Sequence, residues 1–129
     1  MNQAAARRLL GLLGLGARAR TVVIGVEQVR VAARRGRLAL AVVASDASPN
    51  SRKKIEPLLG AIGVRVVRGP EATALGSSVG KGAAAVVGIL DPALARGVRQ
   101  VLVQEGVPEE GERRGAKGAP ARQGARRIG

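Results

Sequence analysis

The stretch LALAVVASDASPNSRKKIEPLLGAI, residues 38–62, contains the clearest structural pattern in the chain. Its first seven residues are all apolar, which is typical of a strand covered on both faces. Ser48 and Pro49 then suit a helix start, because serine accepts hydrogen bonds from free helix N–H groups and proline fits the first turn. Apolar residues follow at the spacing of one helix face: Ile55, Leu58, Leu59 and Ile62. Pro57 removes a backbone hydrogen bond, so we expect it to kink or shorten this helix.

Helical and strand patterns alternate on both sides of this stretch. Gly36 precedes the central strand and is expected to cap the helix before it. In chain order the patterns predict a helix at 3–16, a strand at 21–24, a helix at 26–35, a strand at 38–44, a helix at 48–62, a strand at 64–67, a helix at 71–79, a strand at 83–90 and a helix that begins at Asp91-Pro92. This alternation predicts an α/β domain whose sheet lies between helical layers.

The length of 129 residues suggests one domain. We place it at residues 1–104, because the helical and strand patterns stop at Glu105. The last 25 residues contain six glycines and two prolines without apolar periodicity. This composition predicts a disordered, basic, Gly-rich tail at 105–129.

The chain carries a formal net charge of +13. Residues 1–104 hold 16 basic and five acidic side chains, so most of the charge belongs to the folded domain. This balance favours a polyanionic partner, with nucleic acid first and a membrane surface second. Of the 22 basic residues 18 are arginine, whose planar fork suits phosphate and guanine edges. A GC-rich genome would also explain arginine in place of lysine, but not the excess of basic over acidic residues.

The composition argues against catalysis and against membrane insertion. Cys and His are absent, which removes thiolate and imidazole chemistry and the usual zinc ligands. We find no paired carboxylates, and we expect no cofactor, no metal and no small-molecule substrate. No run of 18 apolar residues exists to span a bilayer. Residues 7–19 imitate a signal peptide, but cleavage there would remove a helix that the domain needs, so we expect a cytoplasmic protein.

Two glycine-rich motifs resemble nucleotide-binding loops but fail on context. Residues 14–19 match G-x-G-x-x-A, yet a helix precedes them and a strand follows, which is the inverse of a dinucleotide site. Residues 76–82, GSSVGKG, are one residue short of a P-loop, and no Ser or Thr follows Lys81. We interpret the second motif as a flexible loop that carries one cation.

The segment Gly25-Val26-Glu27-Gln28 lies where a strand gives way to a helix. The first N–H groups of a helix lack partners and the helix dipole is positive there, so a phosphate can dock. Glu27 and Gln28 would project from the first turn toward base edges. Six arginines crowd the same third of the chain: Arg18, Arg20, Arg30, Arg34, Arg35 and Arg37. An ordinary glycine turn beside a solvated basic face explains these residues equally well.

Taken in order, several segments resemble a known family. They include residues 12–19 (LLGLGARA), residues 25–29 (GVEQV) and residues 44–54 (ASDASPNSRKK), of which the last is the most specific. Shorter matches follow at Leu75-Gly76, Gly80-Lys81, 85–87 and Asp91-Pro92. From about Leu9 to Leu102 the chain resembles the bacterial branch of the L-seven-Ae and L-thirty-e superfamily, the kink-turn-binding ribosomal proteins.

The resemblance implies a three-layer α/β/α sandwich with a small mixed four-stranded sheet. It also implies binding of kink-turn RNA, an internal loop with sheared G·A pairs, which exposes base edges that a regular A-form groove hides. Carried over, the turn that reads guanine edges falls on Gly25, Glu27 and Gln28. The loop that packs on an extruded base falls on Val79, Gly80, Lys81 and Gly82. Phosphate would be neutralised by Arg30, Arg34 and Lys81.

Two departures from the family pattern bear on specificity. Kink-turn binders often have lysine where this chain has Val31, and Asn or Lys where it has Glu27. The first hypothesis is a non-catalytic, cytoplasmic protein that binds structured RNA of the kink-turn or ribosomal kind, with the ribosome as a candidate partner and no membrane. The alternative is a ribosome-associated protein-interaction module that keeps the fold but has lost kink-turn specificity.

Overall fold

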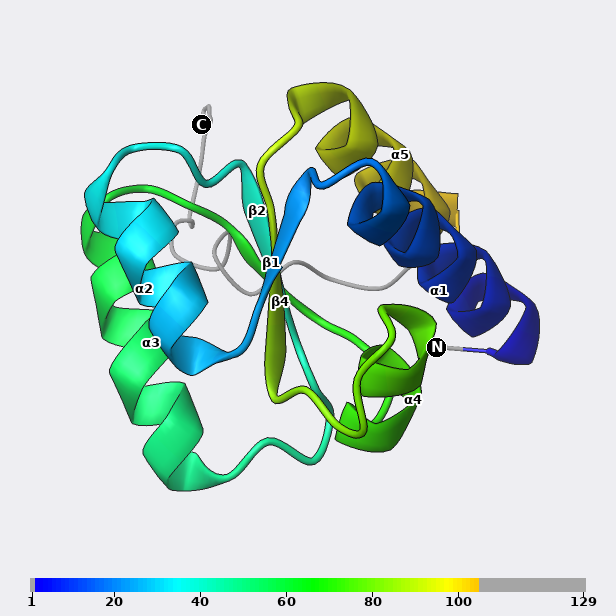
Figure 1. Ribbon diagram of the computed structural model, residues 1–129, viewed down its shortest axis with the longest axis horizontal. Coiled ribbons are helices and arrows are strands. Elements are labelled where there is room, and N and C mark those ends of the chain that lie inside the picture. The colour runs from blue at the N-terminus through cyan, green and yellow to red at the C-terminus, as the bar shows by residue number, and fades with distance from the viewer. Residues whose placement is uncertain (1, 105–129) are drawn as a thin grey trace, which may run out of the picture.

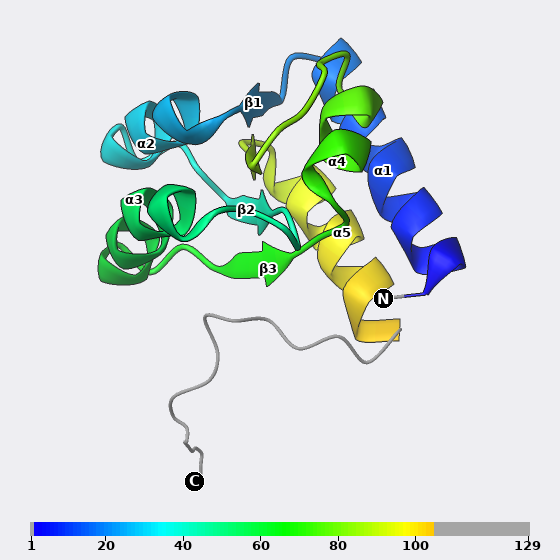
Figure 2. The same ribbon diagram turned by 90° about the horizontal axis from the view of Figure 1, so that it is seen from below.

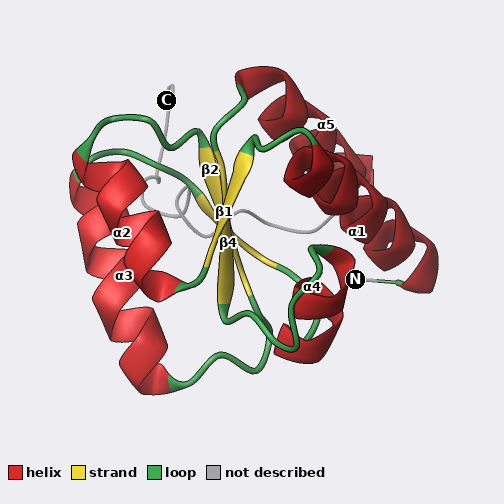
Figure 3. Ribbon diagram, viewed as in Figure 1, coloured by secondary structure: helices red, strands yellow, loops and turns green. Residues whose placement is uncertain are grey.

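The computed structural model describes residues 2–104, and the predicted tail at 105–129 lies outside this range. Within it, helices and strands alternate along the chain (Figures 1 and 3). In order they are α1 (Gln3–Arg18), β1 (Val22–Ile24), α2 (Val26–Arg34), β2 (Leu40–Val43), α3 (Pro49–Ala61), β3 (Val66–Arg68), α4 (Ala72–Ser78), β4 (Val86–Ile89) and α5 (Pro92–Gln104). The predicted order of elements is confirmed.

The strands form one mixed sheet in the order β1-β4-β2-β3. β4 pairs antiparallel with both β1 and β2, and β2 pairs parallel with β3. Helices α2 and α3 cover one face, whereas α1, α4 and α5 cover the other (Figures 1 and 2). The fold is therefore the three-layer α/β/α sandwich that the sequence predicts. In the described part of the chain, no helix is long and apolar enough to cross a membrane.

Strand β2 supplies both hydrophobic cores, as expected for a strand covered on two sides. Leu40 and Val42 belong to the core under α1, α4 and α5, whereas Ala41 and Val43 belong to the core under α2 and α3. The chain has no aromatic residue, so both cores are aliphatic. Small side chains bring the layers close together, and a Cβ on Gly88 would lie only 2.7 Å from Leu38 Cδ1.

The bounds predicted for α1, α3 and β4 differ from those in the structure. α3 runs through Pro57 to Ala61, so the proline does not shorten the helix, which was one of the two effects predicted for it. Buried Ile55 and Leu59 hold this helix on the sheet on either side of the proline. α1 ends at Arg18, two residues beyond the predicted end, because its C-terminal glycines are packing points and not breaks. β4 begins at Val86 and not at 83, since the residues before it belong to the loop against α4.

Three helices end in the same way just before a strand. In α2, Gly36 N donates to Ala33 O and Arg37 N donates to Ala32 O, both at 3.0 Å. These two bonds form the Schellman motif, and the φ of +68° at Gly36 is the left-handed conformation that this motif requires. The predicted glycine cap is therefore confirmed. In α1 the equivalent position is held by Arg20, with a φ of +61°.

Strand direction defines two ends of the sheet. We call the end where β1, β2 and β3 finish and β4 begins the front edge, and it carries the starts of α2, α3 and α4. We call the opposite end the rear edge, and it carries the ends of α1, α2 and α3 and the start of α5. In Figure 1 the front edge lies at the bottom and the rear edge at the top.

Two glycine-to-alanine substitutions in helices should act in opposite directions. A Cβ on Gly76 would lie 2.5 Å from Ala83 Cα, whereas a Cβ on Gly11 meets nothing within 4 Å. Gly76→Ala should lower the free energy of unfolding by about 1–3 kcal/mol through overpacking. Gly11→Ala should raise it by about 0.5–1 kcal/mol, because alanine favours the helix. Urea denaturation measures both, and a Gly76→Ala protein as stable as the parent would contradict this account of the packing.

Candidate nucleic-acid interface

Three segments of the chain meet at the front edge, because β4 pairs with both β1 and β2. Gly25 N donates to Val86 O at 2.9 Å, so the start of α2 lies beside the start of β4. Ala44 N donates to Ala85 O at 2.8 Å, which places the end of β2 on the other side of the same strand. The loop that leads from α4 into β4 therefore lies next to both strand-to-helix turns.

The start of α2 offers unsatisfied backbone donors. Gly25 is the N-cap, with a φ of +95° and no side chain to cap the helix. The first bond of the helix runs from Val29 N to Gly25 O at 3.1 Å. Val26, Glu27 and Gln28 precede that bond, and their amides have no hydrogen-bond acceptor among residues 2–104. Glu27 and Gln28 are exposed, so this turn presents free N–H groups, a positive helix end and two polar side chains.

The predicted loop at 79–82 is anchored at one end and exposed at the other. Val79 is only 8% exposed and belongs to the core under α1 and α4, so it holds the loop in place. Gly80 has a φ of +82°, which lets the chain turn sharply outward. Lys81 N donates to Gly76 O at 2.7 Å, while the side chain of Lys81 is exposed. The loop thus presents one cation and the backbone of Gly80 and Gly82 to solvent.

Arg34 lies away from the front edge. It is the last residue of α2, about 12 Å along the helix axis from Val26 at ~1.5 Å per residue. Because α2 runs from the front edge to the rear edge, Arg34 lies at the rear edge. The structure therefore gathers the turn and the loop predicted as the site, but it separates Arg34 from them.

Arg30 is held by a neighbouring helix. Its Nη1 donates to the main-chain oxygen of Lys54 at 2.8 Å. Lys54 lies in the turn of α3 before Pro57. The half-buried arginine therefore ties α2 to α3 and fixes the position of the helix whose start forms the candidate site.

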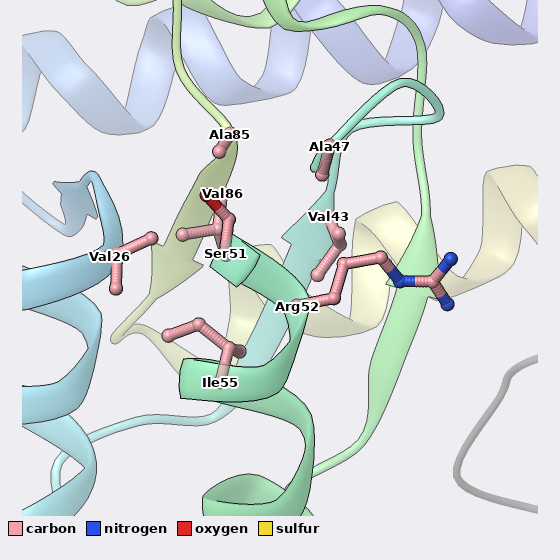
Figure 4. A pocket seen from close by; sticks show the side chains of 8 residues that line it. All are labelled: Val26, Val43, Ala47, Ser51, Arg52, Ile55, Ala85 and Val86. Carbon is pink, nitrogen blue, oxygen red and sulfur yellow. The ribbon is translucent and has the colours of Figure 1, made fainter. Parts of the chain in front are cut away.

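A shallow, mostly apolar gap lies between the starts of α2 and α3. Val26, Ser51 and Ala85 are at its rim, and deeper side chains of the core under α2 and α3 form its floor (Figure 4). Arg52 extends away from the gap (Figure 4). Its Nε donates to Glu56 Oε2 at 2.9 Å. The gap therefore adds apolar surface beside the start of α2, and the one charged side chain that lines it in the described range is paired with Glu56.

The β2–α3 turn is a part of the front edge that site prediction from the sequence did not include. Asp46 Oδ1 accepts a hydrogen bond from Ala72 N at 2.8 Å and so caps α4 from a distance of 26 residues. Ala84 N donates to Ala72 O at 2.9 Å, which links the same helix start to the loop before β4. The segment 44–54 is the most specific part of the family resemblance, and this signal in the sequence could have identified the turn as part of the site.

Comparison with known proteins identifies the family. The model of the Ribosomal protein L7Ae/L30e/S12e/Gadd45 family matches residues 7–101. The chain belongs to this family, and the resemblance inferred from its sequence is confirmed. No significant match is found among curated protein sequences.

Solved structures share the fold. A protein of unknown function from Bacillus halodurans is 32% identical, with a TM-score of 0.70, covering 74% of this chain and 97% of that protein. The 15.5kD RNA binding protein of Giardia lamblia is 23% identical, with a TM-score of 0.68, covering 81% of this chain and 89% of that protein. Both similarities extend over most of the described domain.

Replacing Arg30 should weaken the fold more than replacing Arg34. Arg30→Met keeps the aliphatic stem but removes the hydrogen bond to the Lys54 carbonyl, and should lower the free energy of unfolding by about 1 kcal/mol. Arg34→Met is the matched control on the same helix and should change it by less than about 0.5 kcal/mol. Urea denaturation compares the two variants. Equal effects would show that the bond between α2 and α3 contributes nothing to stability.

Proposed function

We propose that this protein binds structured RNA, of the kink-turn-like or ribosomal kind, through its front edge and without catalysing a reaction. Membership in a ribosomal protein family supports RNA as the ligand. The fold is shared with a Giardia lamblia protein described as RNA binding. The protein would act in the cytoplasm, with the ribosome as a candidate partner.

One observation carries the proposal: the uncapped start of α2 lies directly beside the loop that leads into β4. The free amides of Val26, Glu27 and Gln28 suit a phosphate or a base oxygen. Lys81 adds a positive charge from the neighbouring loop. A compact RNA bend can contact both segments at once, whereas an even A-form groove would hide its base edges from them.

Each part of the front edge has a separate role in this proposal. The Gln28 amide can both donate to and accept from a base edge. The Glu27 carboxylate can accept from guanine N–H groups, but it repels phosphate. The backbone of Gly80 and Gly82 allows close approach of an unstacked base. Buried Val79 would hold that loop at a fixed height above the sheet.

Val31 and Arg30 on α2 bear on whether this protein would be specific for kink-turn RNA. Val31 stands where kink-turn binders often have lysine, and it is 37% exposed on α2. The adjacent Arg30 is held in place by the bond from its Nη1 to α3, which limits its reach toward the RNA. The proposal therefore places RNA recognition mainly on the turn and the loop.

Gln28→Ala should reduce affinity for a structured RNA by about five- to 150-fold, because a paired base contact contributes ~1–3 kcal/mol. The same variant should bind plain duplex RNA as the parent protein does. A gel shift with a kink-turn, a mutated kink-turn and a plain duplex at two salt concentrations measures both effects. Equal losses on structured and duplex RNA would refute base recognition by Gln28.

Glu27→Asn should strengthen RNA binding by about two- to fivefold, because it removes a repulsion between exposed carboxylate and phosphate of roughly 0.4–1 kcal/mol. Glu27→Gln is the matched control, since it removes the charge and keeps the length of the side chain. Binding is measured in the same gel shift. A loss of affinity in both variants would show instead that the carboxylate itself contacts the RNA.

The gel shift also tests the alternative function. A protein-interaction module that has lost RNA specificity would bind all three RNAs alike and no more tightly than any polycation does. Tighter binding to the kink-turn than to the mutated kink-turn and the duplex would exclude that alternative.

A further inference from the structure

Acidic residues are concentrated away from the rear edge. Of the five acidic residues in the described range, Glu27, Asp46 and Glu71 lie at the front edge, and Glu56 is paired with Arg52 inside α3. Asp91 is the one acid at the rear edge. Its carboxylate accepts from Ala93 N at 3.2 Å and Leu94 N at 3.3 Å, so it is occupied as the cap of α5.

Arginines are concentrated at the rear edge instead. Arg20, Arg35 and Arg37 are exposed, and their side chains form no hydrogen bond or ion pair within residues 2–104. Arg20 precedes β1, Arg37 precedes β2 and the half-buried Arg65 precedes β3. With β4 between β1 and β2, the row spans three strand spacings, or about 14 Å at ~4.8 Å each. Such a row can contact several phosphates of one duplex.

Arg20 occupies a backbone position that glycine would fill at lower cost. It is the only non-glycine residue with positive φ in the part of the chain that the structure describes. The equivalent positions at the ends of α2 and α3 are Gly36 and Gly63. A strained arginine at a helix end is a reason to look for a function. A codon preference for arginine does not explain why Arg20, Arg35 and Arg37 all lie at the edge that lacks free carboxylates.

We propose that the rear edge is a second RNA-binding surface, on which Arg20, Arg35 and Arg37 contact the phosphate backbone of duplex RNA without reading its sequence. It lies at the opposite end of the strands from the front edge, and α2 alone separates the two by about 12 Å. One RNA motif at the front edge and a helical stem at the rear edge can therefore be bound together. The surface operates whether or not the front edge recognises a kink-turn.

A matched pair of triple variants tests this surface. The rear-edge variant is R20G/R35Q/R37Q, and the control R7Q/K53Q/K54Q removes three exposed charges from α1 and α3. Both lower the formal net charge from +13 to +10, which is 13 minus 3. The probe is a fully paired RNA duplex of roughly 20 base pairs, followed by fluorescence anisotropy between roughly 50 and 200 mM salt.

The rear-edge variant should bind the duplex at least about tenfold more weakly at low salt. Its slope of log affinity against log salt should fall by about 2–3, near 0.9 for each lost phosphate contact. The control should lose less than about threefold. Equal losses in the two variants would overturn the proposal, because net charge alone would then explain binding.

Arg20→Gly by itself separates function from folding. Removing the positive-φ strain should leave the melting temperature unchanged or raise it, while duplex affinity falls. Arg20→Lys keeps the charge and should retain most of that affinity. Undiminished duplex binding by Arg20→Gly would remove Arg20 from the surface and overturn the interpretation of its strain.

A competition assay separates this proposal from the function proposed for the front edge. Saturating unlabelled kink-turn RNA with minimal stems should leave the labelled duplex bound, and Gln28→Ala should not weaken the duplex complex. Displacement of the duplex would show a single shared surface and would overturn the proposal. If the front edge fails to recognise a kink-turn, the duplex assay still reports on the rear edge.

Discussion

The structure depends on the pairing of β4 between β1 and β2. The bonds Gly25 N to Val86 O and Ala44 N to Ala85 O belong to this pairing, and they bring segments 61 and 41 residues apart to one edge. The loop before β4 is in turn held on α4 by contact between Gly76 and the backbone of Ala83. Without this central strand, the α2 turn and the Lys81 loop would have no fixed relation to each other.

A core without aromatic residues makes close approach between layers important. Branched aliphatic side chains fill both faces of the sheet, and small residues set the distance between layers. Gly16 shows this constraint, because a Cβ there would lie 2.6 Å from Leu94 Cδ2 and 2.7 Å from Val22 Cγ1. The same residues that weaken α1 as an isolated helix therefore allow it to pack. The result is a rigid base from which short turns can present backbone donors.

The two proposed RNA-binding surfaces would divide recognition between geometry and charge. The front edge has fixed amides, Gln28 and a single loop lysine, with acidic residues close by. The rear edge has unpaired arginines and one acid that is already occupied as a helix cap. Base edges are recognised by donors at fixed positions, whereas phosphate needs only positive charge at roughly the right distance. The separation of these features on one small domain suits an RNA with a bend next to a stem.

Local patterns in the sequence predicted the order of elements, the Ser48 start of α3, the Gly36 end of α2 and the family. These features depend on hydrogen bonds and side-chain periodicity within a few residues, so they can be recognised in the chain alone. The positions and partners of the arginines could not be predicted from local patterns, because Arg30 bonds to a residue 24 positions away and Arg34 lies a helix length from Gly25. Strand direction and sheet order assign each turn to one edge or the other, and neither follows from local spacing. The chain thus specified which residues carry charge and which can turn, while packing of the layers specified which of them meet.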